Sequence, residues 1–189
     1  MWNRKSILEY LRNNLNVQRY DHSLRVEKAA IELANFYNID SEKAAIAGLI
    51  HDCAKNMESR DMTDLIKENG YTVDRFFINN GNILHGICGA IIGKTIMEIE
   101  DEDIFNASAY HTTGRADMTL LEKIIYLADY IEPFRNFPGV SELRLLAYEN
   151  LDEALLMSFN NTIKYVIDKG ELIHKDTVDG RNHLLYCRK

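Results

Sequence analysis

Residues Ala44 to Lys55 read AAIAGLIHDCAK, and this stretch decides how the rest of the chain is interpreted. Its first seven residues are small or apolar, which predicts a helix buried on nearly all sides. His51 and Asp52 follow about 100° apart around a helix, so that both can reach one ion in the groove between them. Lys55 shares the face of His51 one turn later, and Gly48 leaves room beneath the imidazole. Taken alone, a buried hydrogen-bonded His–Asp pair explains the stretch about as well as a metal does.

The composition is that of a helical globular protein. Of the 189 residues, 46% are hydrophobic and 27% charged, and only ten are Gly and two Pro. We therefore expect a single domain over residues 1–189, built from about eight or nine helices without strands. The net charge of −7 argues against a nucleic-acid surface, so that an anionic substrate must be drawn in by a local positive site.

Cysteine usage and hydropathy predict a cytoplasmic protein. The three cysteines, Cys53, Cys88 and Cys187, are widely spaced and form no CxxC pair, which argues against disulfides and thiolate zinc sites. The N-terminal MWNRKSILEYLRNNL places Glu9 and Arg12 within its apolar pattern, which indicates an amphipathic helix and not a signal peptide. No apolar run is long enough to span a membrane, so we expect no membrane partner.

Capping and breaking residues divide the chain into successive helices. Ser, Thr, Asp or Asn before an apolar-periodic segment predicts a helix start, and Gly or Pro after it predicts an end. Within residues 82–97, four small residues make a face that lets another helix approach closely: Gly86, Gly89, Ala90 and Gly93. The predicted boundaries are helices over Ser6–Asn14, Ser41–Cys53 and Asp61–Asn69, N-caps at Asp21, Asp40, Thr119, Ser141 and Asn150, ends at Gly70, Gly114, Pro133 and Gly170, and a short helix from Thr177.

Four metal-competent side chains lie where an apolar helix face meets the core: His22, His51, Asp52 and Asp129. A lone histidine of this kind is more often a cap or a satisfied core residue, and a lone Asp is more often paired with Arg. Three separate helices supply these four groups, however, and burying all of them without an ion is costly. Imidazole and carboxylate ligands without thiolate suit iron, manganese, cobalt or a catalytic zinc.

The sequence does not decide the roles of several other polar residues. His85 and His111 complete a second metal site, donate to a substrate phosphate, or are ordinary histidines. Lys55 and Arg135, the latter in a loop between the two prolines, are phosphate ligands if the metal is present and surface charges if it is not.

Several segments together carry a resemblance to a known family. His22, the HD pair at residues 51–52 and Asp129 in YLADYIEP resemble the H…HD…D signature of the HD-domain metal-dependent phosphohydrolases. More closely, RYDHSLRV, GLIHDCAK, ILHGICGA, YHTTGRADMTLLEKIIYLADYIEPFR and VIDKGELIHKDTVDGRNHLL are similar to the YqeK family of symmetrical dinucleoside tetraphosphate hydrolases. The resemblance covers about residues 5–187 and implies an all-α HD-domain helical bundle.

The resemblance also implies an activity, a cofactor and site residues. That family cleaves diadenosine tetraphosphate symmetrically to two ADP with iron, so the implied partners are a dinucleoside polyphosphate substrate and ADP, with a homodimer left open. His22, His51, Asp52 and Asp129 are the implied ligands of one iron ion, with a second ion left open and manganese, cobalt or zinc as substitutes. The implied catalytic residues are Asp52, which orients the water, and His85 and His111. The implied substrate-binding residues are Arg19, Lys55, His85, His111, Thr112, Arg135, Gly170, Glu171, Leu172, Ile173, His174 and Lys175.

Two other functions stay open on sequence grounds. One is a different phosphohydrolase on the same metal, acting on nucleoside triphosphates or cyclic nucleotides, which its products would distinguish. The other is a metal-containing nucleotide sensor that binds without hydrolysis, although the complete set of metal-competent residues argues against it. A purely structural helical protein is the remaining alternative.

Overall fold

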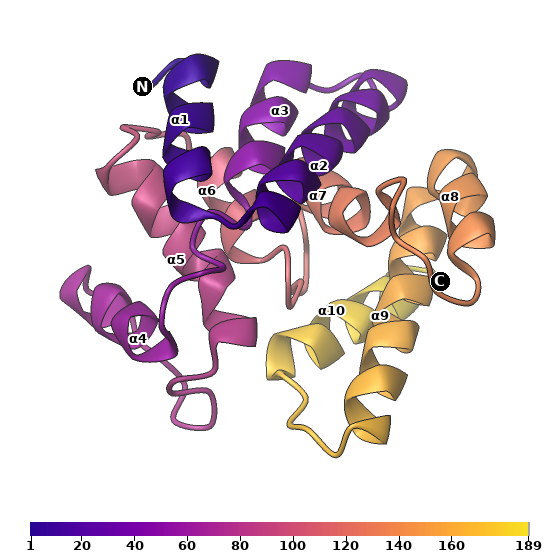
Figure 1. The fold of residues 1–189 in the computed structure, drawn as a ribbon. Coiled ribbons are helices and arrows are strands. Elements are labelled where there is room, and N and C mark those ends of the chain that lie inside the picture. Colours follow the sequence, from indigo (N-terminus) through magenta and orange to yellow (C-terminus); the bar gives the residue numbers. More distant parts are fainter. Residues whose placement is uncertain (189) are drawn as a thin grey trace.

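A computed structural model describes residues 1–188, and this part of the chain is entirely helical, with ten helices and no strand. Figure 1 shows α1–α3 and α5–α7 gathered in the upper half of the view, with α4 at the lower left and α8–α10 on the right. The helices are α1 (Arg4–Asn14), α2 (Val17–Phe36), α3 (Ser41–Ile50), α4 (Ser59–Glu68), α5 (Gly81–Thr95), α6 (Glu102–Ala109), α7 (Leu120–Ile131), α8 (Val140–Glu149), α9 (Leu151–Asp168) and α10 (Lys175–Cys187).

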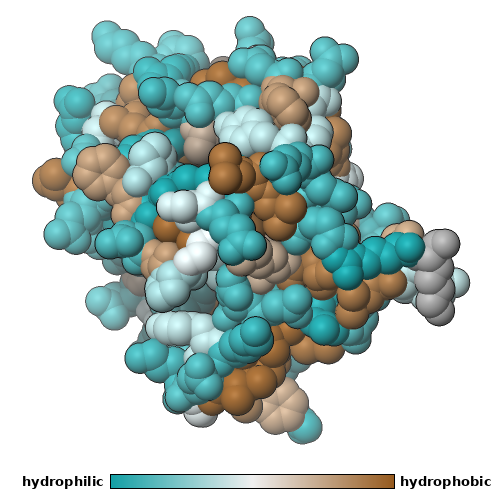
Figure 2. Space-filling model, turned by 90° about the vertical axis from the view of Figure 1, so that its right-hand side faces the viewer, coloured by the Kyte–Doolittle hydropathy of each residue, from teal (hydrophilic) through white to brown (hydrophobic). Residues whose placement is uncertain are grey.

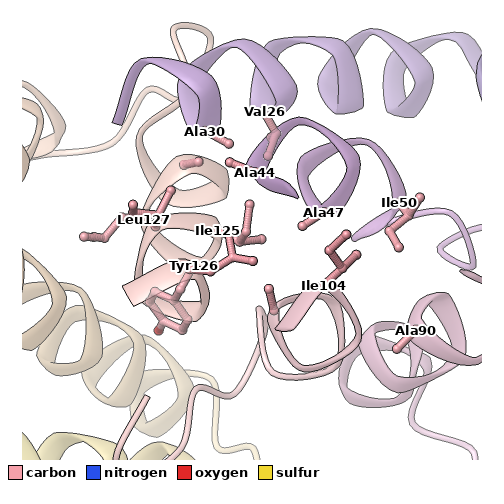
Figure 3. Close-up of a cluster of buried hydrophobic side chains, with 14 of the residues drawn as sticks. Val26, Ala30, Ala44, Ala47, Ile50, Ala90, Ile104, Ile125, Tyr126 and Leu127 are labelled. Atoms are coloured by element: carbon pink, nitrogen blue, oxygen red, sulfur yellow. The ribbon is translucent and has the colours of Figure 1, made fainter. Parts of the chain in front are cut away.

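Helix α3, the apolar stretch quoted above, lies at the centre of the core. It packs most extensively on α2 and also contacts α1, α5, α6 and α7. Figure 3 shows Ala44 of α3 beside Ala30 of α2, and Ala47 on the side of α3 nearer to Ile104 of α6, and all four residues are buried. Small side chains at these positions let the helix axes come close, which removes the apolar surface of α3 from water on nearly every side.

Gly48 serves this packing and not a ligand. A Cβ added at Gly48 would lie 3.0 Å from the Cα and 3.1 Å from the backbone N of Glu27 in α2. The space predicted beneath the His51 imidazole is therefore occupied by the backbone of α2, and that part of the sequence interpretation is wrong.

Helix α5 confirms the predicted small-residue face. A Cβ on Gly86 would lie 2.8 Å from the carbonyl oxygen of Ala109 in α6, and one on Gly89 would lie 3.0 Å from the carbonyl oxygen of Ile50 in α3. Only glycine lets the three backbones approach this closely, and this approach places the start of α5 beside the end of α3.

Local capping signals located some helix starts correctly and others incorrectly. Asp40, Thr119 and Asn150 each accept a hydrogen bond from the first turn of α3, α7 and α9, as predicted. The start predicted at Asp21 is wrong, because Asn16 caps α2 and the helix begins five residues earlier than predicted. The start predicted at Ser141 is also wrong, since α8 begins after Gly139 in a left-handed conformation.

Residues 1–188 form ten helices where about eight or nine were expected, and the helix of the tail is longer than predicted. Helix α10 begins at Lys175, capped by the His174 side chain, and not at Thr177. Gly180 lies within it because a Cβ there would meet the Arg115 carbonyl oxygen at 2.8 Å, so the glycine permits close packing and does not end the helix. None of the described helices is long and apolar enough to cross a membrane. The face shown in Figure 2 is mostly hydrophilic, with hydrophobic side chains in separate groups.

Candidate metal centre and substrate cleft

Three helices bring His22, the His51–Asp52 pair and Asp129 together. His22 lies in the second turn of α2, the pair follows directly on α3, and Asp129 lies in the last turn of α7. His22 Nε2 is 2.9 Å from Asp129 Oδ1, and His51 Nε2 is 3.7 Å from Asp52 Oδ2. The metal-competent residues form two groups of three, and within each group the ligand atoms lie within 4.8 Å of one another. The first group is His22, His51 and Asp129, and the second is His51, Asp52 and His111.

The end of α3 explains how two adjacent residues serve one centre. The helix stops at Ile50 and not at the predicted Cys53, and residues 51–56 continue as turns. The amide N–H of Cys53 donates to the Ile50 carbonyl at 3.0 Å and that of Lys55 to the Asp52 carbonyl at 2.9 Å. These tighter turns bring the Asp52 carboxylate and the His51 imidazole into one cluster.

Backbone carbonyls hold three imidazoles by Nδ1. Because a carbonyl oxygen can only accept a hydrogen bond, each of these Nδ1 atoms carries the hydrogen. In the neutral ring, Nε2 then presents its lone pair to the centre of the cluster, which is the form that binds a metal. The donors and acceptors are His51 and Gly48 at 2.7 Å, His85 and Gly81 at 2.9 Å, and His111 and Ser108 at 2.7 Å.

These lone pairs face other acceptors. His85 Nε2 lies 3.0 Å from His111 Nε2 and 3.0 Å from Asp52 Oδ1. Thr112 Oγ1, at 3.2 and 3.1 Å from the two rings, can donate its single hydrogen to only one of them. The Lys55 ammonium can donate to His85 Nε2 at 3.2 Å, so a single lysine and the Thr112 hydroxyl are the donors within residues 1–188 that reach these three acceptors, and a metal cation would satisfy them further.

Two further nitrogen atoms are left without a hydrogen bond. His22 Nε2 and His51 Nε2 are buried and have no hydrogen-bond partner in residues 1–188, although the Asp129 carboxylate lies 2.9 Å from His22 Nε2. Each buried unpaired nitrogen costs about 1–3 kcal/mol. Neutral imidazole nitrogens and carboxylate oxygens that converge in this way fit a bound divalent metal ion.

The electrostatics keep both ligand types in the protonation state that a metal requires. Burial lowers the pKa of His51 to about 3 and also lowers the pKa of His85. Burial acts to raise the pKa of Asp52 and Asp129, but the nearby histidines, together with Arg135 for Asp129, hold both well below the usual range. At neutral pH, His51 and His85 are therefore uncharged and the carboxylates are ionised.

Three cations surround this cluster, of which two pair with a carboxylate and the third does not. Arg19 Nη1 lies 2.9 Å from Asp52 Oδ2, and Arg135 donates to both the carbonyl and the carboxylate of Asp129. Lys55 Nζ instead lies 3.2 Å from His85 Nε2 and makes no ion pair within residues 1–188. Burial lowers the pKa of Lys55, with the Asp52 charge opposing that effect. An anionic substrate would supply the partner that this ammonium lacks.

Comparison with known proteins identifies the family. The HD-domain family matches residues 19–133, more than half of the chain and all four converging metal-competent residues. The chain belongs to the HD-domain family.

Full-length relatives narrow the family further. The chain is 42% identical over 187 residues to the symmetrical bis(5′-nucleosyl)-tetraphosphatase of Halalkalibacterium halodurans, covering 99% of this chain and 100% of the relative. It is 41% identical to the enzyme of that name from Bacillus subtilis, covering 93% and 94%. The crystal structure of a predicted HD superfamily hydrolase involved in NAD metabolism from Clostridium acetobutylicum superposes with a TM-score of 0.97 at 52% identity, covering 100% of both chains.

A cleft of about 760 Å³ opens beside the metal centre of this HD domain, and we call it the main cleft. The predicted Arg19, Asp52, Lys55, His85, His111, Thr112, Asp129 and Arg135 all line it. Its opposite wall was not predicted and includes Tyr126, Tyr130 and Phe137, together with Thr162 and Tyr165 of α9. The spacing of Tyr126 and Tyr130, which places both on one face of α7 near Asp129, is the sequence signal that could have revealed it.

The segment Gly170–Lys175 lies elsewhere in this HD domain. Gly170, Glu171 and Leu172 are exposed, and none of the six residues lines the main cleft. His174 and Lys175 line a separate cavity of about 500 Å³, which we call the rear cavity. There the His174 ring packs against Phe77 with centroids 4.8 Å apart.

Glu132, which the sequence analysis did not select, orients His22 in this HD domain. Its buried carboxylate lies 3.3 Å from His22 Nδ1 and accepts hydrogen bonds from Arg25 Nε at 2.7 Å and from the Phe134 amide at 2.8 Å. A carboxylate on Nδ1 fixes the tautomer and directs Nε2 inward.

Glu132→Gln should therefore weaken metal binding by about 10- to 100-fold without unfolding the protein. The measurement is metal affinity by competition with a chelator. Glu27→Gln is the matched control, because Glu27 is also buried and its carboxylate also pairs with an arginine, Arg4 at 2.6 Å, but within residues 1–188 that carboxylate pairs with none of the four metal-competent residues. Equal affinities in the two variants would contradict a positioning role for Glu132.

The metal-free HD domain should lose stability as the pH falls below about 6.5. The usual pKa of histidine is 6.5, and burial lowers that of His51 to about 3, so in this range the unfolded chain binds a proton that the folded chain does not. One such group lowers the free energy of unfolding by up to about 1.4 kcal/mol per pH unit. Urea unfolding of chelator-treated protein between about pH 6.5 and pH 5 tests this, above the range where ordinary carboxyl groups titrate. The His51→Asn variant should show a shallower slope, and an unchanged slope would refute the assignment.

Proposed function

We propose that this protein hydrolyses diadenosine tetraphosphate symmetrically to two molecules of ADP. One water molecule is consumed: its oxygen bonds to one of the two central phosphorus atoms, and the bond from that phosphorus to the central bridging oxygen breaks. The bridging oxygen leaves on the second ADP, and the two water protons are released to the products or the solvent. The names of the full-length relatives support this choice of substrate.

The observation that carries the proposal is the convergence of inward Nε2 atoms and two carboxylates at the floor of a cleft walled by cations. His22, His51, Asp52 and Asp129 would hold a divalent ion there, which we assign as iron, with manganese, cobalt or zinc as substitutes. When bound, the ion supplies Lewis acidity that activates water and polarises phosphoryl oxygens at neutral pH.

The cations bind the tetraphosphate and the carboxylate orients the water. Arg19, Arg135 and Lys55 face the main cleft and would neutralise the phosphate oxygens, whose negative charge has to be compensated as the central bond breaks. Asp52 Oδ1, which lies in the main cleft 3.0 Å from His85 Nε2, would accept a hydrogen bond from the attacking water.

His85 is better placed as an acceptor than as a donor to a substrate phosphate, which was one of the roles left open by the sequence. Burial lowers its pKa and its Nδ1 hydrogen is committed to the Gly81 carbonyl, so its Nε2 faces the site without a hydrogen. We therefore assign hydrogen-bond donation to the departing diphosphate to Lys55 and the Thr112 hydroxyl, while His111 completes the second group of ligands.

One reaction tests the function. Protein purified without oxygen is incubated with diadenosine tetraphosphate, and bound metal is quantified in the same sample. ADP as the sole nucleotide product, with iron at about one ion or more per chain, is the expected result. ATP with AMP as products would contradict symmetrical cleavage, and tight binding without turnover would indicate a nucleotide sensor.

A further inference from the structure

A second groove begins on the far side of Lys55. It has a volume of about 550 Å³, and Lys55 is the one residue that it shares with the main cleft; we call it the side groove. Its walls come from the turns after α3, the first turn of α4, the segment between α4 and α5 and the start of α5, including Met57, Phe76, Ile78 and Asn82. Both volumes fall within the range of about 300–1,000 Å³ that is usual for small-ligand sites.

The substrate has two identical halves, and each half needs space on its own side of the reacting bond. Cleavage at the central bridge leaves a nucleoside with two phosphates on either side of the reacting bond. If the main cleft holds one half with its phosphates at the metal centre, the other half must extend away from the same centre. Lys55, a partly buried ammonium without an ion pair in the described residues, stands where the two cavities meet.

We propose that the side groove receives the second nucleoside diphosphate half of the substrate, with the base against Phe76 and the phosphates against Lys55. This inference rests on the proposed tetraphosphatase activity. It assigns a specificity role to residues outside the metal centre.

The chemistry of the side groove suits a nucleoside. Phe76 and Ile78 are 59% and 46% exposed. The Arg75 guanidinium lies 4.7 Å over the Phe76 ring, so the opposite face of that ring, together with Ile78, is available for stacking on a base. The side-chain amide of Asn82 has no hydrogen-bond partner in residues 1–188 and can serve a ribose hydroxyl or a base edge. Asn79 commits its Oδ1 to the Thr63 hydroxyl at 3.1 Å, which orients its amide at the rim.

The rear cavity is the competing location. It is aromatic as well, with Tyr71, Phe77 and His174 in its wall, but it shares no lining residue with the main cleft. Residues 110–113 separate the two, since Thr112 lines the main cleft whereas Tyr110 and Thr113 line the rear cavity. A polyphosphate that crosses the metal centre therefore continues into the side groove more directly.

Three aromatic truncations in the metal-loaded full chain test the assignment. Phe76→Ala removes the proposed base contact and should raise KM for diadenosine tetraphosphate about tenfold with kcat nearly unchanged. Phe36→Ala is the matched control, because Phe36 is 56% exposed and lies at the end of α2, about 20 Å along the helix from His22. Tyr71→Ala probes the rear cavity.

A titration with ADP gives a readout that is independent of turnover. The wild-type protein should bind two ADP per chain, and Phe76→Ala should weaken one of the two sites and leave the other unchanged. A single ADP site in the wild type, an unchanged KM in Phe76→Ala, or a rise in KM confined to Tyr71→Ala would each overturn the assignment. If the wild type does not cleave diadenosine tetraphosphate, the proposed function fails and the inference falls with it. Normal cleavage with an unaffected Phe76→Ala removes the inference alone.

Discussion

Asp129→Asn should yield a folded protein that retains little metal and loses at least about 100-fold in turnover. The Asp129 carboxylate lies 2.9 Å from His22 Nε2 and 4.0 Å from His51 Nε2, and it pairs with Arg135. The amide keeps the shape but removes the charge, so that Arg135 is left beside a neutral group and the ion loses an anionic ligand. Metal content by elemental analysis and ADP release on the same sample give the answer.

Asp152→Asn is the appropriate control for this change. Asp152 also pairs with a cation, Lys123 Nζ at 2.7 Å, but its side chain is 57% exposed and remote from the metal ligands. We expect it to keep wild-type metal content and turnover, because exposed ion pairs contribute little. Full metal and turnover in Asp129→Asn would show that the ligand set is wrong.

Gly114→Ala should destabilise the protein by roughly 3 kcal/mol or more. Gly114 has φ +60°, which a Cβ disfavours, and the added atom would lie 2.4 Å from Cζ of Phe159, a fully buried residue of α9. Both effects act on residues 111–114. His111 and Thr112 of this segment line the main cleft. The midpoint of urea unfolding measures the loss.

Gly70→Ala separates the two causes. Gly70 also has a positive φ, +80°, but nothing lies within 4 Å of a Cβ built there. It should lose only the conformational term of roughly 1–2 kcal/mol. Equal losses in the two variants would mean that Phe159 moves aside and that the segment after His111 is less tightly fixed than its contacts indicate.

Local chemistry made some features predictable. Asp40, Thr119 and Asn150 cap their helices through a side-chain oxygen only two or three residues from its donor, so nearby sequence was sufficient. The starts predicted at Asp21 and Ser141 failed for the same reason, because such residues can cap a helix but also occur inside one. Nothing local distinguished them from the actual starts.

Some residues of the candidate site could be predicted from the sequence and others could not. The apolar stripes of α2, α3 and α7 must all face one core, so the sequence could predict that His22, the His51–Asp52 pair and Asp129 converge. The contact of Glu132 with His22 and the part that α9 takes in the cleft wall depend on how helices distant in sequence pack together. Hydrophobic periodicity does not predict that packing. The position of Gly170–Lys175 was taken from the resemblance, and the structure places that segment around the rear cavity and on the surface.

The glycines of α5 also determine how close the imidazoles of the site lie to one another. Gly86 brings the α5 backbone against Ala109 and leaves a would-be Cβ only 3.2 Å from Nδ1 of His111, while Gly89 lies against the carbonyl of His51. The separation between the imidazoles is therefore fixed by main-chain contact, which cannot relax by a change of rotamer. A single methyl group at Gly86 or Gly89 should therefore move His85 and His111 relative to His51, although neither glycine is itself a metal-competent residue.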